Sequence, residues 1–363
     1  MNFNFKATIL SVAILGGSIL PGVSYSDVLL KANGVSTAQD ADDYYSIIDP
    51  NNLRLTQKDW RIVNGFEDKD GNPIPGNEVV VVGGHKNVSD LGFWRRIEMV
   101  VDNRRGKKGN VAFTTFNYET EDDAVNNINA KSIVNMEYSP GPNGDRITKF
   151  YIYYSEDDPE INNRGKRKPS TFFDPDGLKD QNRKEDLFLP NGCASCHGGG
   201  EDFRAHSGKT GGGFLAFDFN VFEYGTQTNR AANEANVKKL NQGVLKTNPP
   251  SAVKSLIYGL YGGSGLPLAT QKSDYIPSTW AAEPALWGVI VKDCLGCHTL
   301  SEKEVLDLNF WKRSVGELRE QVLKKKLMPN SPYANRRFWN TDPNQTPTNH
   351  RQIVEEALQR FRP

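Results

Sequence analysis

The stretch NVAFTTFNY, Asn110–Tyr118, has the clearest strand pattern in this chain of 363 residues, because β-branched and aromatic residues dominate it and Gly109 bounds it. Four further stretches have the same character. They are EVVVVG (Glu78–Gly83), WRRIEMVV (Trp94–Val101), SIVNMEYS (Ser132–Ser139) and TKFYIYYS (Thr148–Ser155). Since no helical pattern separates these consecutive strands, we expect an antiparallel sheet or sandwich in this part of the chain.

A short helix is predicted ahead of the sheet. Thr56 and Asp59 have the spacing of an N-terminal cap, Trp60 and Val63 supply the buried side, and Gly65 ends the helix. From Glu185 onward, helical spacing replaces the strand pattern. Helices are expected at Ala231–Leu245, from Pro250 to Leu260, at Glu283–Leu295, from a Ser314–Glu317 capping box to Leu327, and at Asn349–Phe361. The predicted fold class is therefore α+β, with a β-rich antiparallel N-terminal domain followed by mainly α-helical domains.

The charges of the chain balance. It has 44 Lys and Arg against 44 Asp and Glu, so the formal net charge is zero. A neutral chain has no strong field that would steer it toward nucleic acid or an anionic membrane surface. We therefore expect no nucleic-acid partner.

The first 26 residues have the order of a secretory signal peptide. Lys6 supplies a positive charge, Ala7–Leu20 is an unbroken apolar run, and small residues precede a cleavage site after Ser26. The apolar run has 14 residues, fewer than the roughly 20 that span a bilayer. No later run is long and apolar enough to span one. We expect a periplasmic or secreted mature chain without a membrane span.

All four cysteines lie in two copies of one pattern, CASCH (Cys193–His197) and CLGCH (Cys294–His298). Disulfides are the usual use of cysteine outside the cytosol, but cysteines three apart close too small a loop. A bridge between the pairs would leave the following histidines unexplained. Zinc ribbons separate their pairs by about 15–20 residues, whereas 97 residues lie between these two pairs. A thioredoxin-type redox pair needs a βαβ setting, which neither copy has.

Covalent attachment of c-type haem accounts for the whole pattern. Residues i, i+3 and i+4 share one face of a helix, so both thiols can form thioethers with the vinyl groups of one porphyrin. The next side chain, His197 or His298, then reaches the iron from the same side. We expect two covalent haems, attached at Cys193 and Cys196 and at Cys294 and Cys297.

The last segment resembles a class I cytochrome c domain. A helix runs into the CLGCH motif, Met328 and Pro329 follow, and a helix closes the chain. The proline disfavours helical backbone at Met328, so this residue is expected in extended chain. The resemblance covers Pro277–Pro363, and it implies His298 and Met328 as the two axial ligands of the second haem iron.

The sequence leaves the sixth ligand of the first haem open. His206 follows His197 by nine residues, enough extended chain to round a porphyrin edge, although exposure at the surface fits it better. Met99 and Met136 lie in predicted strands, where core packing is the simpler role. An open iron site is the fourth alternative. The remaining histidines are expected at the surface: His85 and His350.

A wider resemblance extends over most of the mature chain. The segments that carry it are DWRIVNGF, DLGFWRR, VAFTTFNY, MEYSPGPNG, TKFYIYYS, LFLPNGCASCHGG, FLAFDFNVFEYG and LNQGVLKTNPPSAVKSLIYGLYGG. They are similar to the recurring segments of a group of secreted bacterial cytochrome c domain proteins, which pair a β-rich N-terminal region with two C-x-x-C-H sites. The resemblance implies haem content, architecture and secretion, and it implies no particular reaction.

These predictions divide the chain into four parts. They are a signal peptide (1–26), a β-rich domain of unknown role (27–184), a first haem-binding segment (185–276) and a class I cytochrome c-like haem domain (277–363).

Electron transfer is the predicted function, with redox proteins or small redox molecules as partners, because two haems on one exported chain suffice for it. The alternative is a haem enzyme of peroxidase or oxygenase type, in which the first iron has an open face and the second haem supplies electrons. No catalytic acid or base is visible in the sequence. In a third alternative, the β-rich region binds a polymer or mineral surface.

Overall fold

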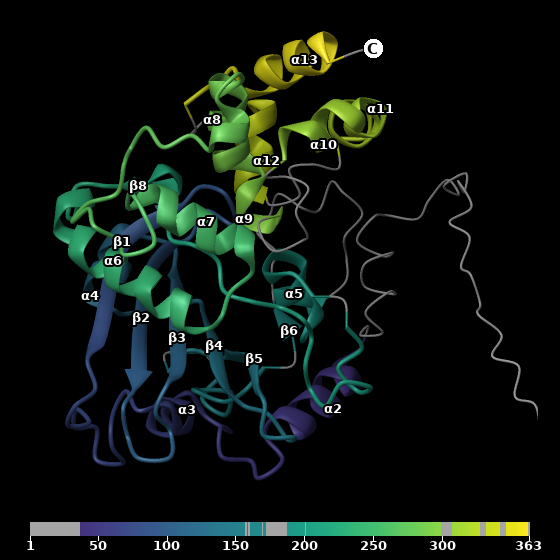
Figure 1. Cartoon of the computed structure of the whole chain (residues 1–363). Coiled ribbons are helices and arrows are strands. Elements are labelled where there is room, and N and C mark those ends of the chain that lie inside the picture. Colours follow the sequence, from purple (N-terminus) through teal and green to yellow (C-terminus); the bar gives the residue numbers. More distant parts are fainter. Residues whose placement is uncertain are drawn as a thin grey trace, which may run out of the picture.

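The structure is a computed structural model. It describes residues 37–156, 158, 160–168, 170–171, 187–199, 201–298, 307–326, 332–341 and 346–361. The predicted signal peptide and the predicted ligand Met328 lie outside the described residues. Within them, helices combine with a six-stranded and a two-stranded antiparallel sheet, so the α+β class is confirmed (Figure 1).

The larger sheet has the strand order β5-β4-β3-β2-β1-β8, and all neighbouring strands are antiparallel. Its strands are β1 (Val79–Asn87), β2 (Trp94–Asp102), β3 (Asn110–Tyr118), β4 (Ser132–Pro140), β5 (Arg146–Tyr153) and β8 (Phe222–Tyr224). The five predicted strands are confirmed, and β1 continues to Asn87 rather than ending at Gly83. Strand β8 is not among the predicted strands. It follows the first cysteine motif in the sequence and pairs with the end of β1.

The helices fall into two groups. Before the first cysteine motif lie α2 (Ala38–Ile48), α3 (Gln57–Asn64) and α4 (Glu121–Asn126). From that motif onward lie α5 (Asn191–His197), α6 (Arg230–Lys246), α7 (Ser251–Leu260), α8 (Pro284–Asp293), α9 (Leu295–His298), α10 (Leu308–Arg313), α11 (Val315–Leu318), α12 (Pro332–Trp339) and α13 (His350–Arg360). The smaller sheet pairs β6 (Ser170–Thr171) with β7 (Leu187–Phe188).

The helices predicted at α3, α6, α7, α8 and α13 are confirmed. Thr56 caps α3 and forms a reciprocal capping box with Asp59. The capping box predicted at Ser314 is wrong, because the Ser314 side chain forms no capping hydrogen bond and α11 runs on into a π-helical turn at Arg319–Lys324. The spacing of that sequence fits a box, but the backbone at Ser314 is not in the extended conformation that a capping side chain needs.

One face of the larger sheet carries a row of buried apolar cross-strand neighbours: Met99, Phe113, Met136 and Phe150. We call this the apolar face. Helix α6 lies across it, and Gly243 of α6 comes so close that a Cβ there would be 3.1 Å from the sulfur of Met99 (Figure 1). Phe214 and Phe217 pack on Phe113 with ring centroids 5.2 and 5.7 Å away. Both methionines are therefore core residues.

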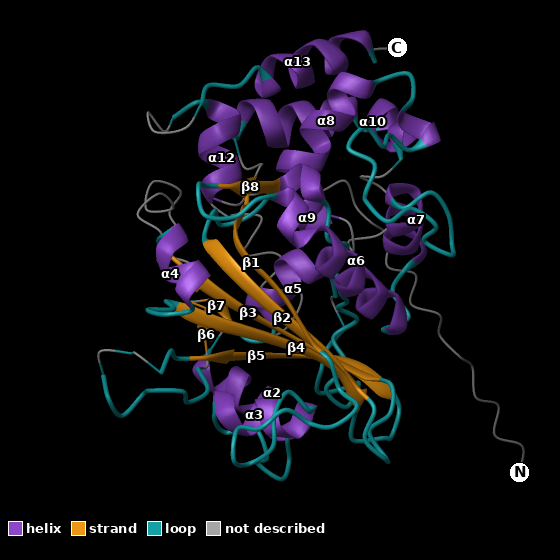
Figure 2. Ribbon diagram, turned by 90° about the vertical axis from the view of Figure 1, so that its left-hand side faces the viewer, coloured by secondary structure: helices purple, strands orange, loops and turns teal. Residues whose placement is uncertain are grey.

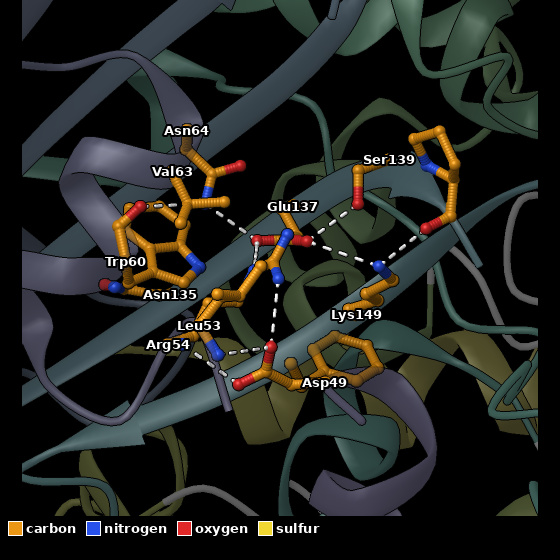
Figure 3. A network of polar contacts seen from close by, with 12 residues as sticks. Asp49, Leu53, Arg54, Trp60, Val63, Asn64, Asn135, Glu137, Ser139 and Lys149 are labelled. Atoms are coloured by element: carbon orange, nitrogen blue, oxygen red, sulfur yellow. Dashed lines mark hydrogen bonds and ion pairs between the residues drawn. The ribbon is translucent and has the colours of Figure 1, made fainter. Parts of the chain in front are cut away.

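The opposite face, which we call the polar face, carries a buried network centred on Glu137 (Figure 3). The Glu137 carboxylate accepts from Arg54 Nε at 2.9 Å, from Asn64 at 2.7 Å and from Ser139 at 2.7 Å, and Lys149 Nζ lies 3.4 Å away. Burial by itself raises the pKa of Glu137, but the cations of Arg54 and Lys149 outweigh burial and hold this pKa at about 2. The carboxylate is therefore ionised wherever the protein is folded near neutral pH.

Helix α2 covers the edge strand β5. The Tyr44 hydroxyl accepts the backbone N–H of Phe150 at 3.0 Å, and the Tyr45 hydroxyl accepts that of Ile152 at 3.2 Å. These are the N–H groups that an edge strand would otherwise present to another chain. In the C-terminal group, α12 and α13 pack against the apolar helix α8 (Figure 2).

We predict that Glu137→Gln lowers the free energy of unfolding by about 3–5 kcal/mol, because it leaves the buried cations of Arg54 and Lys149 uncompensated. Urea unfolding at pH 7 measures the change. A matched control is Glu119→Gln. Its ion pair with Lys131 is 3.5 Å long with both side chains at least half exposed, so a change of less than about 0.5 kcal/mol is expected. Equal effects from the two variants would contradict the assignment of Glu137 as the anchor of the polar face.

Candidate haem centres

The CASCH motif occupies one short helix. Helix α5 contains Cys193, Cys196 and His197, so the three side chains that the chemistry needs start from one helical turn, as predicted. The backbone N–H groups of Cys193 and Ala194 both donate to the carbonyl of Pro190, which starts the helix without a capping side chain. Cys193 is 6% exposed and packs in the main core.

The CLGCH motif follows the apolar helix α8. This helix ends at Asp293, and Cys294 has a non-helical φ of −122° before α9 begins at Leu295. The helix predicted to run without a break over Glu283–Leu295 is thus interrupted at Cys294, the first cysteine of the motif. The N–H of His298 donates to the carbonyl of Cys294 at 3.1 Å, so the motif still closes one helical turn. Cys193 and Cys294 form no disulfide, and burial raises the pKa of both thiols.

His197 is held in one tautomer. Its Nδ1 lies 3.0 Å from the carbonyl oxygen of Gly213, and a carbonyl can only accept, so Nδ1 carries the proton. The N–H of Gly213 in turn donates to the carbonyl of His197 at 2.9 Å. Nε2 is then the nitrogen with the lone pair, which is the arrangement found where a second group orients an iron-bound imidazole. Burial also lowers the pKa of His197 and favours the neutral ring that a metal requires.

The surroundings of His197 are partly charged. Asp90 and Arg95 form an ion pair of 2.7 Å, and Arg95 Nε also donates to Asn117 at 3.1 Å. After burial and the Gly213 bond, these two charges act on the pKa of His197, Arg95 lowering it and Asp90 raising it. On the apolar side, the Phe150 ring lies 5.8 Å from the imidazole. Burial also lowers the pKa of His298.

His85 is fully buried, so its predicted position at the surface is wrong. Strand β8 pairs with β1 at His85 and covers it, with the Phe222 ring stacked 4.1 Å from the imidazole. Neither ring nitrogen has a hydrogen-bond partner among the described residues. Burial, followed by the cation of Arg95, lowers the pKa of His85 to about 3. The covering strand lies more than 130 residues further along the chain, so local sequence carried no sign of it.

The structure also shows where His206 and His350 lie. His206 is exposed, as expected for it. His350, predicted at the surface, is instead partly buried, with Nδ1 2.6 Å from the carboxylate of Asp293. Arg337 also pairs with Asp293, so α12 and α13 are both tied to the residue just before Cys294. His350 starts α13, and the packing of α13 on α8 brings it inward.

Among the described residues, no cluster of three His, Cys, Asp or Glu side chains could hold a bare metal ion. A porphyrin supplies four iron ligands itself, so the pairing of thiols with His197 needs no such cluster.

Every helix in the described ranges is too short or too polar to cross a membrane. Compared with known protein families, curated proteins and solved structures, the chain has no match.

We predict that His85 makes the protein acid-sensitive. The unfolded chain binds a proton at His85 below about pH 6.5, but the folded chain does so only near pH 3. The free energy of unfolding should therefore fall as the pH drops below 6.5, by at most about 1.4 kcal/mol per pH unit from this group. In His85→Leu the part of this slope that His85 contributes should be absent, so the variant should gain stability relative to wild type as the pH drops.

Urea unfolding of both proteins at pH 7.5, 6 and 5 measures this difference. His206→Leu, which changes an exposed histidine, is the matched control. Parallel pH dependences of wild type and His85→Leu would contradict a neutral, buried His85.

Proposed function

We propose that this chain is an exported dihaem c-type cytochrome that transfers electrons between redox partners. The observation that supports it most is the orientation of His197. His197 belongs to the short helix that carries Cys193 and Cys196, and its Nδ1 donates to the carbonyl of Gly213 outside this helix, which leaves Nε2 available to an iron atom. A histidine with a purely structural role would need no cysteine pair on the same turn.

The chain's own residues have distinct parts in this proposal. Bound haem iron would supply one-electron exchange between the ferric and ferrous states. Cys193 and Cys196 would hold one porphyrin by thioether bonds, and Cys294 and Cys297 would hold the other. His197 would bind one iron through Nε2, and His298 would bind the second iron. The carbonyl of Gly213 fixes the plane and the proton of the His197 ring, and the apolar face limits access of water from the Phe150 side.

The C-terminal segment is proposed to be a class I cytochrome c-like domain with His298 and Met328 as axial ligands. Helix α8, which leads into the motif, packs against the closing helix α13, in keeping with that resemblance. The Asp293 contacts with Arg337 and His350 tie both helices that follow to the start of the motif. Met328 enters this proposal from the sequence alone.

Export is part of the proposal, because c-type haem is joined to protein outside the cytosol and the first 26 residues have the pattern of a signal peptide. The mature protein would be periplasmic or secreted. Redox proteins or small redox molecules are the expected partners.

We predict that the mature chain, expressed with a haem-maturation system, carries two covalent haems. Intact-mass measurement under denaturing conditions should give the polypeptide plus two haems, because thioether bonds survive unfolding. Cys193→Ser with Cys196→Ser should leave one haem, and so should Cys294→Ser with Cys297→Ser. A wild-type mass without attached haem would refute the proposed function.

We predict that the reduced wild-type protein binds no carbon monoxide, since a pure electron carrier keeps both axial positions of each iron filled by protein. Spectrophotometric titration of the ferrous protein measures this. One equivalent bound by wild type, and lost when His197 is replaced, would favour the haem enzyme instead. His206→Ala tests the exposed histidine as the missing ligand: if that variant alone binds one equivalent, His206 completes the first site.

A further inference from the structure

The two cysteine motifs touch. Helices α5 and α9 lie side by side, with Cα atoms of the two helices within 8 Å of each other, although 97 residues separate the cysteine pairs in the sequence. Both views of the fold agree on this placement (Figure 1, Figure 2). We refer to these two helices as the motif pair.

The turn after β1 contacts one member of the motif pair and carries a charge that acts on the other. Ser89, which follows β1 and is 2% exposed, packs against Gly296 of α9. A Cβ at Gly296 would lie 2.5 Å from the Ser89 hydroxyl and 3.2 Å from its carbonyl oxygen, so the approach needs glycine there. The next residue, Asp90, carries a negative charge that acts on His197 of α5. The turn after β1 therefore fixes α9 relative to the surroundings of the first motif.

The contact zone is poorly accessible to water. Cys193 and Ala194 of α5 and Leu295 of α9 are buried, and Cys196, His197, Cys294 and His298 are partly buried. Electrostatic interactions across such a zone are screened much less than between surface groups.

We propose that the two haem sites form one coupled redox unit, in which an electron taken up at one motif passes directly to the other. This rests on the proposed function. Thioether bonds would keep each porphyrin close to its motif. Because α5 and α9 are in contact, the two porphyrins would then lie within range of each other's electric field and transition dipoles. In the exchange, ferrous iron at one motif becomes ferric while ferric iron at the other becomes ferrous, and no further reactant is consumed.

Circular dichroism in the Soret band tests the coupling. Two interacting porphyrins add an exciton couplet to the spectrum that the two separate haems would give. The wild-type protein should give the couplet. The Cys193→Ser/Cys196→Ser and Cys294→Ser/Cys297→Ser variants, each with one haem, should lose it. A wild-type spectrum that equals the sum of the two single-haem spectra would overturn the proposal. If neither variant folds, the oxidised, half-reduced and reduced wild-type spectra replace them, and a half-reduced spectrum equal to the mean of the other two overturns the proposal.

Gly296→Ala tests the part played by the turn after β1. The new methyl group must push α9 away from Ser89, so the couplet should lose amplitude while both haems stay attached, because the cysteines and histidine of the motif are unchanged. Gly288→Ala is the matched control, since a Cβ there meets no atom within 4 Å. Equal amplitudes in the two variants would refute the role of the Ser89 contact.

The same samples separate this inference from the proposed function. Two haems by intact mass, with reversible reduction but additive circular dichroism, would support the proposed cytochrome and contradict the coupling between its haems. Absence of attached haem would remove both.

Discussion

The packing of Met99, Phe113, Met136 and Phe150 against the second half of the chain is the contact on which the structure depends. This row crosses four strands, and the contacts described above that cover it come from the first motif and from residues that follow it. Helix α6 lies at one end, Phe214 and Phe217 lie over the middle, and His197 lies over Phe150. Burial of the apolar face therefore also positions His197 of the first cysteine motif.

The polar face is held together by hydrogen bonds and ion pairs instead of apolar packing. A buried carboxylate such as Glu137 is costly unless every lone pair is used, and here Arg54, Asn64, Ser139 and Lys149 use them. Because side chains alternate between the faces, a shift of β4 by one residue would move Glu137 to the apolar face and Met136 to the polar one. The network thus fixes the register of β4, and the register fixes which side chains lie beneath the first motif.

The sequence predicted those helices and strands whose formation depends mainly on neighbouring residues. Strand β3 has β-branched and aromatic residues between turn residues, and α3 has its cap at Thr56, so both were predictable. The features that the sequence did not predict depend on contacts between residues far apart in the chain. Strand β8 has three residues and forms because β1 offers a free edge. His85 is buried by that same pairing, and His350 by the packing of α13 on α8. A single histidine carries no pattern that distinguishes these positions from a surface.

The candidate site divides in the same way. The spacing of Cys193, Cys196 and His197 predicts which atoms share a helical turn, since i, i+3 and i+4 always do. It says nothing about Gly213, which orients His197 from 16 residues away, or about the contact between α5 and α9. That contact arises because the intervening chain crosses the apolar face and adds β8 beside β1, and the turn after β1 then meets Gly296. The shared sheet thereby brings together two motifs that the sequence keeps 97 residues apart.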